Sequence, residues 1–234
     1  MLIETVETTA STNQDMIARA GEGAPEGAWL RAVTQTAGRG RLGRDWSSSP
    51  GNLHASTIVR LLPGDPPAAT LTLVAAVALD EIVSAWIPGR VLLKWPNDLL
   101  VDGAKLSGIL LERSRDAVIV GIGANLAHSP DGLDRPVTSI AAVGGAAPDP
   151  ALFVEDLAIS FTRWLGRWRS EGLEPVRTRW LARAHPLGTA LTAHMPGGGT
   201  QDGLFEGLDA DGALRLRLAD GRVETIHAAD VFML

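Results

Sequence analysis

Residues 91–123 constrain the fold more than any other part of the sequence, because short apolar runs alternate there with turn signals. Asp102-Gly103 lies between two such runs and is a strong signal for a tight hairpin. A second turn is expected at Ser114-Arg115-Asp116, before another apolar run that ends at Gly121. We therefore expect consecutive antiparallel strands in this region.

The rest of the first 185 residues alternates between strand and helix patterns. Strands are expected at 1–10, 29–34 and 53–62, and helices at 11–21, between Pro66-Pro67 and Pro88-Gly89, and at about 150–170 and 173–183. Ser11 is expected to cap the first helix, with Gln14 completing a capping box. The apolar run 71–87 is interrupted by Asp80 and Glu81, which predicts a buried helix and not a membrane span.

The pattern changes after Pro186, where glycine-rich turns separate short alternating segments. In the clearest of these, the leucines 214, 216 and 218 alternate with the arginines 215 and 217. Short strands at close spacing predict a small β-barrel or sandwich. We therefore expect two domains, 1–186 and 187–234.

Composition excludes several classes of function. The net charge of −6 argues against broad binding to nucleic acids or membrane surfaces. The chain has no cysteine, so disulfides and thiolate chemistry are excluded. Its five histidines are scattered without ligand spacing, which argues against a zinc site. No signal peptide pattern is visible at the start, so we expect a cytoplasmic protein without membrane partners.

The loop Gly38-Arg39-Gly40-Arg41-Leu42-Gly43 stands out against this acidic background. Its glycines allow the backbone to approach a ligand closely, and its arginines supply a positive field, so it predicts an anion site. A dinucleotide-binding fold would require a helix directly after such a glycine pattern. Here Asp45 to Gly51 follows and cannot begin a helix, which argues against that fold.

Polar residues also gather in three other segments. Ser11-Thr12-Asn13, paired with Gln35, can bind a small polar head group or simply cap a helix. Lys94 to Asp98 and Lys105 to Gly108 place two lysines near one sheet edge, where they repel each other unless anions lie between them. Gly121 to Asn125 ends a strand with an asparagine that suits either a nucleotide or a turn.

Together, in this order and at this spacing, the four segments closely resemble the biotin–protein ligases, and the resemblance covers nearly the whole chain. It implies an α+β fold: a class II synthetase-like catalytic domain with a mixed, largely antiparallel sheet, followed by a small SH3-like β-barrel. Because the first matching segment lies so near Met1, we expect the form without an N-terminal DNA-binding domain and no nucleic-acid partner.

The resemblance also implies roles for individual residues. It assigns biotin binding to Ser11, Thr12, Asn13, Gln35, Gly38, Arg39, Gly40, Arg41, Lys105 and Gly108. It assigns the ATP or adenylate side to Arg41, Arg44, Trp46, Lys94, Asn97, Asp98, Lys105 and Asn125. Catalysis falls to Arg41 and Lys105, whereas the residues that touch a metal ion stay unassigned.

The implied reaction uses biotin, ATP and Mg²⁺ to form biotinyl-5′-AMP, and then transfers biotin to a lysine of a biotin carboxyl carrier domain. The alternatives are a lipoate–protein ligase with the same adenylate logic, a non-catalytic biotin or nucleotide sensor, and a peptide-binding module built on the terminal barrel. Either a monomer or a homodimer is compatible with the sequence.

One segment departs from the family pattern. His227 to Val231 lacks the glycine that is often found at the final turn. We expect this difference to affect details of the small domain and not catalysis.

Overall fold

The computed structural model describes residues 2–233 and contains two β-sheets. The larger sheet has seven strands in the order β1-β2-β3-β7-β6-β5-β4. Its strands are β1 (Leu2–Thr9), β2 (Ala28–Gln35), β3 (Leu53–Arg60), β4 (Val91–Lys94), β5 (Asp98–Val101), β6 (Ala104–Ser114) and β7 (Ala117–Ala124). Only β1 and β2 pair in parallel; the other neighbours are antiparallel. The predicted mixed, largely antiparallel sheet is therefore confirmed, as are the consecutive strands of residues 91–123.

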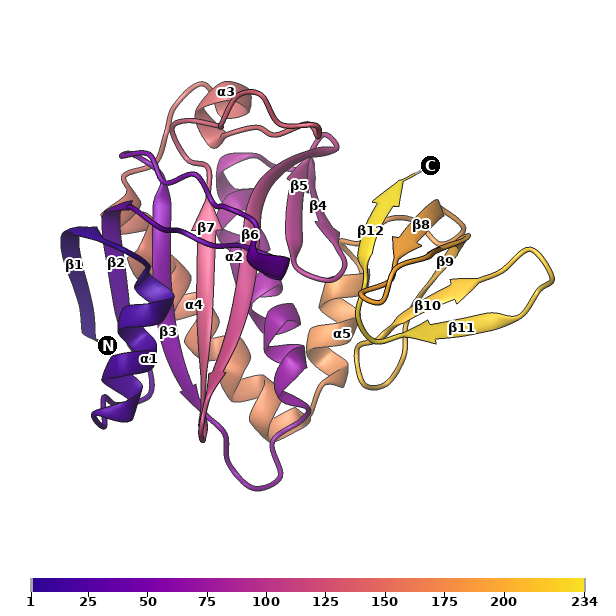
Figure 1. The fold of residues 1–234 in the computed structure, drawn as a ribbon, viewed down its shortest axis with the longest axis horizontal. Coiled ribbons are helices and arrows are strands. Elements are labelled where there is room, and N and C mark those ends of the chain that lie inside the picture. Colours follow the sequence, from indigo (N-terminus) through magenta and orange to yellow (C-terminus); the bar gives the residue numbers. More distant parts are fainter. Residues whose placement is uncertain (1, 234) are drawn as a thin grey trace.

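Helices cover both faces of this sheet (Figure 1). The helix α1 (Thr12–Gly21) lies on one face, where Met16 and Ala20 pack against Leu30, Ile58 and Ile119. The opposite face is covered by α2 (Leu71–Trp86), α4 (Pro150–Glu171) and α5 (Glu174–Leu181). A short helix, α3 (Ile140–Gly144), and the single turns η1 (Arg41–Gly43) and η2 (Ala68–Thr70) complete the chain's helical content within residues 2–233.

The helix α2 confirms the prediction of a buried apolar helix. Residues Ala68–Trp86 are long and apolar enough to cross a membrane by length and composition, but 61% of this stretch is buried inside the protein. Asp80 in its middle is fully buried and forms ion pairs with Arg179 and Arg183 near the end of α5, at 2.7 and 3.1 Å. A buried charge is tolerated where it is paired and hydrogen-bonded, so these pairs explain an acidic residue in an apolar helix.

The smaller sheet has five antiparallel strands in the order β11-β10-β9-β8-β12, the arrangement of an SH3-like domain. Its strands are β8 (Ala190–His194), β9 (Thr200–Leu208), β10 (Leu214–Arg217), β11 (Val223–Ile226) and β12 (Asp230–Met233). Leu214 and Leu216 are buried while Arg215 and Arg217 are exposed, as the alternation predicted. Among the contacts that join this sheet region to the larger unit, the Trp95 indole N–H donates to the carbonyl of Gly212 and the Arg177 guanidinium donates to that of Leu208.

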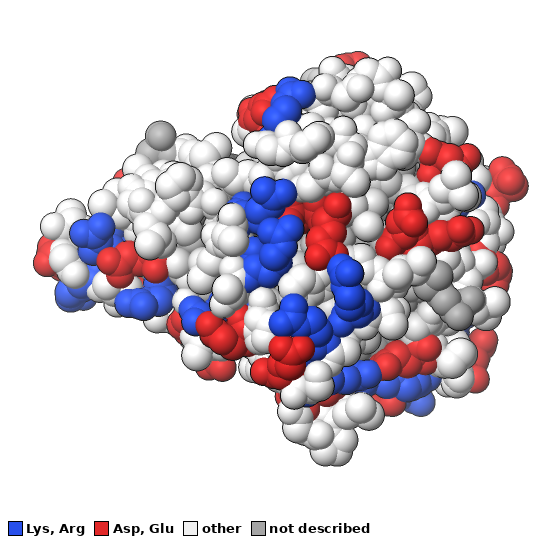
Figure 2. Space-filling view, turned by 180° about the vertical axis from the view of Figure 1, so that it is seen from behind, with Lys and Arg blue, Asp and Glu red and all other residues white. Residues whose placement is uncertain are grey.

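The face behind the larger sheet carries charges of both signs side by side (Figure 2). Ion pairs account for this mixing on α4, where Arg163 pairs with Glu81, Arg167 with Glu171, and Arg169 with Glu26. One local prediction is wrong. Ser11 occupies the N-cap position of α1, but its side chain makes no capping hydrogen bond and instead lines a cavity.

Candidate functional site

The site is built on one row of paired residues that crosses five strands. From β4 to β3 the row reads Lys94, Asp98, Gly108, Gly123 and His54. Residues directly opposite one another in antiparallel strands project their side chains to the same face of the sheet. The row therefore has charged groups at one end, a histidine at the other and bare backbone in the middle.

Trp46 lies over the two glycines of this row. A Cβ atom on Gly123 would lie 2.6 Å from the Trp46 indole nitrogen, and one on Gly108 would lie 3.2 Å from the indole ring. The distance at Gly123 is shorter than a side chain tolerates and the one at Gly108 is a tight contact, so the absence of a side chain at both positions lets the indole rest on the sheet. The Lys105 ammonium lies 5.7 Å from the centre of the same ring, within the range of a cation–π interaction.

The loop that carries Trp46 closes on itself before it reaches the sheet. The backbone N–H of Gly40 donates to Arg44 at 2.7 Å, and that of Trp46 donates to Gly38 at 3.0 Å. Leu42, at the tip, has a left-handed backbone with φ of 56°. No helix follows the glycines, so the prediction that this is not a dinucleotide-binding loop is confirmed.

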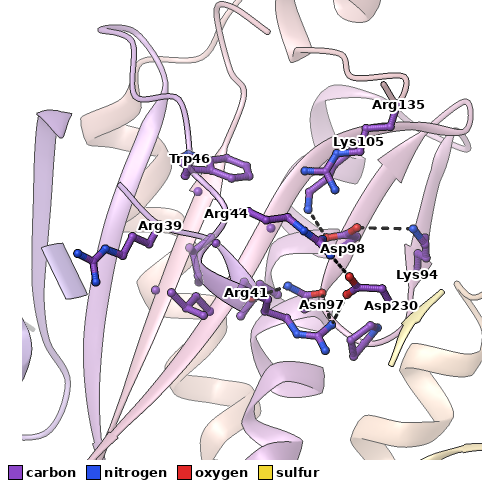
Figure 3. A pocket seen from close by; sticks show the side chains of 18 of the residues that line it. Arg39, Arg41, Arg44, Trp46, Lys94, Asn97, Asp98, Lys105, Arg135 and Asp230 are labelled. Carbon is purple, nitrogen blue, oxygen red and sulfur yellow. Dashed lines mark hydrogen bonds and ion pairs between the residues drawn. The ribbon is translucent and has the colours of Figure 1, made fainter. Parts of the chain in front are cut away.

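Asp98 lies between the two lysines of the site (Figure 3). Its carboxylate forms an ion pair with Lys105 and lies 3.8 Å from the Lys94 ammonium. The anion expected between these lysines is thus supplied by the protein itself. Burial lowers the pKa of both Lys94 and Lys105, and the negative charge of Asp98 opposes this shift.

A second carboxylate, Asp230 of β12, binds the arginine loop. It forms ion pairs with Arg44 and with Arg41, the latter at 3.4 Å, while the Arg41 guanidinium also donates to the carbonyl of Ala229 at 3.2 Å and to Asn97 at 3.3 Å. The segment 227–231 thus reaches beyond the small domain to the arginine loop, whereas the expectation that its missing glycine leaves catalysis unaffected stays a prediction. Burial lowers the pKa of Arg41, with an opposing contribution from Asp98.

These groups form one end of a cavity of about 400 Å³. Six cationic side chains and four carboxylates line the cavity, so it is cationic although the chain as a whole has a net charge of −6. Arg39 lies apart from the other cations in Figure 3, and Arg135 joins them beside Lys105. We call this part of the cavity, made of Arg41, Arg44, Lys94, Asp98, Lys105, Arg135 and Asp230, the charged end.

The opposite part, the neutral end, is lined by Ser11, Thr12, Asn13 and Gln35. These come from the start of α1 and the end of β2, which lie together because β1 and β2 pair in parallel. The Thr12 backbone N–H donates to the Gln35 side-chain oxygen at 2.8 Å. Asn13 lies over Gly121, where a Cβ atom would come within 2.8 Å of the Asn13 carboxamide carbon.

The structure brings together almost all residues that the sequence indicated. The residues assigned to biotin or ATP line the cavity, with the exceptions of Gly38 and Asn125. Gly38 is part of the loop closure. The Asn125 amide donates to the carbonyl of Thr138 at 3.0 Å, which is the turn role considered as its alternative, and this geometry gives no support to an ATP contact.

Sequence reasoning missed several residues of the site. His54, Arg135 and Asp230 line the cavity, and Ser56 and Glu112 contact its lining residues from behind. The charge of Arg135 and Asp230 was visible in the sequence, but nothing local indicated their position. His54 and Ser56 lie two residues apart in β3, so the alternation of the strand placed them on one face.

Comparison with known proteins agrees with this geometry. The model of the biotin/lipoate A/B protein ligase family matches residues 6–125, and that of the biotin protein ligase C terminal domain matches residues 188–234. A biotin--[acetyl-CoA-carboxylase] ligase of Paracoccus denitrificans is 43% identical over 96% of this chain and 97% of its own length.

Two solved structures share the fold over nearly the whole chain. The biotin protein ligase from Aquifex aeolicus in complex with biotin and ATP has a TM-score of 0.89 at 24% identity, covering 100% of this chain and 99% of that one. The biotin protein ligase from Leishmania major in complex with biotinyl-5-AMP has a TM-score of 0.70 at 26% identity, covering 97% and 99%. This chain therefore belongs to the biotin/lipoate A/B protein ligase family, and within that family to the biotin protein ligases, which are ATP-binding enzymes.

Proposed function

We propose that this enzyme activates biotin with ATP as biotinyl-5′-AMP and then transfers biotin to a lysine of a biotin carboxyl carrier domain. The observation that carries the proposal is one cavity with a neutral, amide- and hydroxyl-lined end and a cationic end. Biotin has the same division, with an uncharged ureido ring and a carboxylate. The related Leishmania major enzyme was solved with biotinyl-5-AMP.

The neutral end is proposed to hold the bicyclic ring of biotin. A urea offers two N–H donors and one carbonyl acceptor, and Ser11, Thr12, Asn13 and Gln35 present hydroxyl and amide groups that match them. Hydrogen-bonding groups discriminate strongly against a ligand that leaves them unpaired. The backbone of Arg39 and Gly40, next to this end, then encloses the valeryl chain that leads toward Arg41.

The charged end is proposed to carry out adenylate formation. An oxygen of the biotin carboxylate attacks the α-phosphorus of ATP, the bond from that phosphorus to the bridging oxygen breaks, and pyrophosphate leaves. Two unit charges 4 Å apart repel by about 4 kcal/mol at an effective dielectric constant of 20. Arg41 and Lys105 lie where they can neutralise both anions and stabilise the charge that develops during transfer.

The nucleotide is proposed to bind against the remaining cations of the charged end and the Trp46 indole. Arg44, Lys94 and Asn97 face the same space, and the indole offers a flat surface to a base or alkyl chain. Asp98 pairs with both Lys94 and Lys105, and the phosphates of the nucleotide are proposed to take over part of this pairing. Gly108 contributes by leaving room for both Trp46 and the Lys105 ammonium.

In the transfer step a lysine amine of the carrier domain attacks the carbonyl carbon of the mixed anhydride. A new C–N bond forms, the bond from the carbonyl carbon to the phosphate oxygen breaks, AMP leaves, and the amine releases one proton. Closure of the loop 38–46 excludes water from the anhydride until the amine arrives. No enzyme nucleophile is required, which agrees with a chain that lacks cysteine.

Magnesium is proposed to enter as part of the substrate, MgATP. Within residues 2–233 no group of three His, Cys, Asp or Glu side chains lies close enough to hold a metal ion. Mg²⁺ is commonly bound through one or two carboxylates, several waters and substrate phosphates. Asp98 and Asp230 are the carboxylates of the charged end, and both already pair with its cations. A resident protein-only Mg²⁺ site does not fit this arrangement.

We also propose that residues 1–186 and 187–234 act as two domains. The connection between α5 and β8 carries the change from the larger sheet to the smaller one, and the C-terminal family model begins at residue 188. The contact of Asp230 with the arginine loop gives the smaller domain a part in arranging the active site.

The test is pyrophosphate release with MgATP and either biotin or lipoate. Release with biotin alone, followed by labelling of a carrier-domain lysine, is the expected result. Release with lipoate alone would retain the adenylate chemistry but overturn the substrate. Measurable biotin binding without release with either acid would identify a sensor. Labelling without a carrier domain would contradict the proposed acceptor.

A further inference from the structure

Glu112 lies behind the neutral end of the cavity. It belongs to β6 and pairs with Ile119 of β7, on the face of the sheet that α1 covers. Its carboxylate accepts a hydrogen bond from the Asn13 side-chain nitrogen at 2.6 Å. Glu112 does not line the cavity, so any effect on a ligand must pass through Asn13.

The carboxylate decides which way the Asn13 amide faces. An ionised carboxylate only accepts hydrogen bonds, so the NH₂ group of Asn13 must point toward Glu112. The Asn13 oxygen then faces Ser56, whose hydroxyl donates to it at 2.6 Å. Ser56 is fully buried, and its single proton is therefore engaged by Asn13.

This orientation continues along the network to Thr12. The hydroxyl oxygens of Thr12 and Ser56 lie 2.7 Å apart, and either could donate by geometry alone. Because the Ser56 proton is engaged, the Thr12 hydroxyl is the donor in this pair, and Ser56 is the nearer of its two acceptors, the other being the Gln35 oxygen at 3.1 Å. The Gln35 orientation is fixed separately: its oxygen accepts from the Thr12 backbone N–H at 2.8 Å, and its nitrogen faces Ser48 at 3.1 Å.

We propose that Glu112 is a positioning residue that sets the direction of the side-chain hydrogen bonds from Asn13 through Ser56 to Thr12. As a result, the Thr12 hydroxyl and the Gln35 oxygen keep lone pairs that the network does not use. These acceptors suit the N–H groups of a cyclic urea, whereas the dithiolane ring of lipoate has no N–H to offer. Glu112 thereby favours a urea over a sulfur ring, an inference that rests on the proposed biotin site.

The experiment compares Glu112→Leu and Glu112→Gln with the wild type and with Glu206→Gln as a matched control. Glu206 is also a half-buried glutamate on a strand, but it pairs with Arg215 and Arg217 of the smaller sheet. Calorimetry without ATP gives the Kd of biotin, and pyrophosphate release gives the KM of biotin and of ATP. Thermal unfolding shows whether each variant is folded.

We expect Glu112→Leu to raise the Kd and KM of biotin by roughly tenfold. This is the size of effect expected when one hydrogen bond to the ligand is lost because Asn13 and its neighbours are no longer oriented. The KM of ATP should change less than about twofold, because the charged end keeps its contacts. Glu112→Gln should recover part of the biotin affinity, since its amide oxygen can still accept from Asn13. The control variant should bind biotin like the wild type.

A reciprocal exchange separates positioning from mere packing. In the double variant Asn13→Asp with Glu112→Gln, the new amide donates to the new carboxylate, which still accepts from Ser56. This variant should bind biotin more tightly than Glu112→Leu. An unchanged biotin Kd in folded Glu112→Leu would overturn the proposal, as would equal losses for biotin and ATP that neither Glu112→Gln nor the exchange restores. Because the Kd is measured without ATP, failure of the proposed ligase reaction would leave this result interpretable.

Discussion

The two ends of the cavity satisfy their polar groups in opposite ways. At the neutral end, side chains hydrogen-bond one another in a continuous network from Glu112 to Ser48, and the network contains a single formal charge. At the charged end there are five cations and two carboxylates, and four of the cations pair with Asp98 or Asp230. The first end has its side chains oriented by one another before a ligand arrives, whereas the second keeps an excess of positive charge.

This difference indicates that the neutral end recognises the ligand and the charged end promotes the chemical step. A network with fixed donor and acceptor directions discriminates between uncharged ligands by leaving mismatched groups unpaired. An excess of partly buried cations attracts anions and stabilises charge that develops in a transition state. Substitutions at one end should therefore affect different kinetic parameters from substitutions at the other.

The largest expected effect is that of Lys105→Ala at the charged end. Removing this cation from beside the reacting groups should lower the rate of pyrophosphate release by roughly a thousandfold. Biotin binding without ATP should change little, because the neutral end is intact. Rapid-quench measurement of adenylate formation tests this directly, with thermal unfolding as a check on folding. A rate within tenfold of the wild type would contradict a catalytic role for Lys105.

A pair of glycine substitutions should separate the two ends. A methyl group at Gly121 collides with Asn13, and one at Gly123 collides with the Trp46 indole. We expect Gly121→Ala to raise the KM of biotin by roughly ten- to a hundredfold, and Gly123→Ala to act mainly on the KM of ATP. Steady-state kinetics with each substrate varied in turn provides the measurement. Identical effects of both substitutions would show that the ends are not independent.

Arg41→Gly should have a smaller effect on the rate of adenylate formation and a clear effect on its retention. Arg41 ties the loop to Asn97, Ala229 and Asp230, so its loss should let the loop open. Free biotinyl-5′-AMP should then accumulate in solution, at roughly several-fold the wild-type level after equal turnover. Chromatography of the filtered reaction mixture quantifies it. The idea would be falsified if the adenylate stayed bound in this variant.

The smallest predicted effect concerns pH. Burial lowers the pKa of Lys105, and Asp98 partly offsets this shift by stabilising the protonated amine. Replacing Asp98 with asparagine removes that support, so the pKa of Lys105 should fall further. Lys105 would then lose its proton at a lower pH, and the alkaline limb of the rate profile should move toward neutral pH. A limb that stays in place in Asp98→Asn would show that another group controls it.

The sequence predicted most of the fold because its local signals agree with one another. Asp102-Gly103 marks the hairpin that joins β5 to β6, and alternating leucines mark β10. The parallel pairing of β1 with β2 was not predicted, since partner choice between distant strands leaves no local signal. The capping box at Ser11 failed because the hydroxyl faces a cavity that other segments create.

The site was predicted where its residues cluster along the chain and missed where they do not. The arginine loop and the Lys94 to Asp98 segment each carry several functional groups together. Asp230 lies 186 positions from its partner Arg44, and Glu112 lies 99 positions from Asn13. Such pairs depend on which strands become neighbours, and a single sequence does not contain that information in local form.

The row from Lys94 to His54 ties activity to the completeness of the sheet. Its members come from five strands, and each reaches the cavity only if its strand pairs in the observed register. A slip of one residue in any of these strands would turn its side chains to the other face. A partly folded chain would therefore lack the charged groups, the indole platform or both. Reactive adenylate should be made only by molecules in which the whole sheet is assembled. The rate of adenylate formation in a sample should therefore be proportional to its fraction of correctly folded molecules.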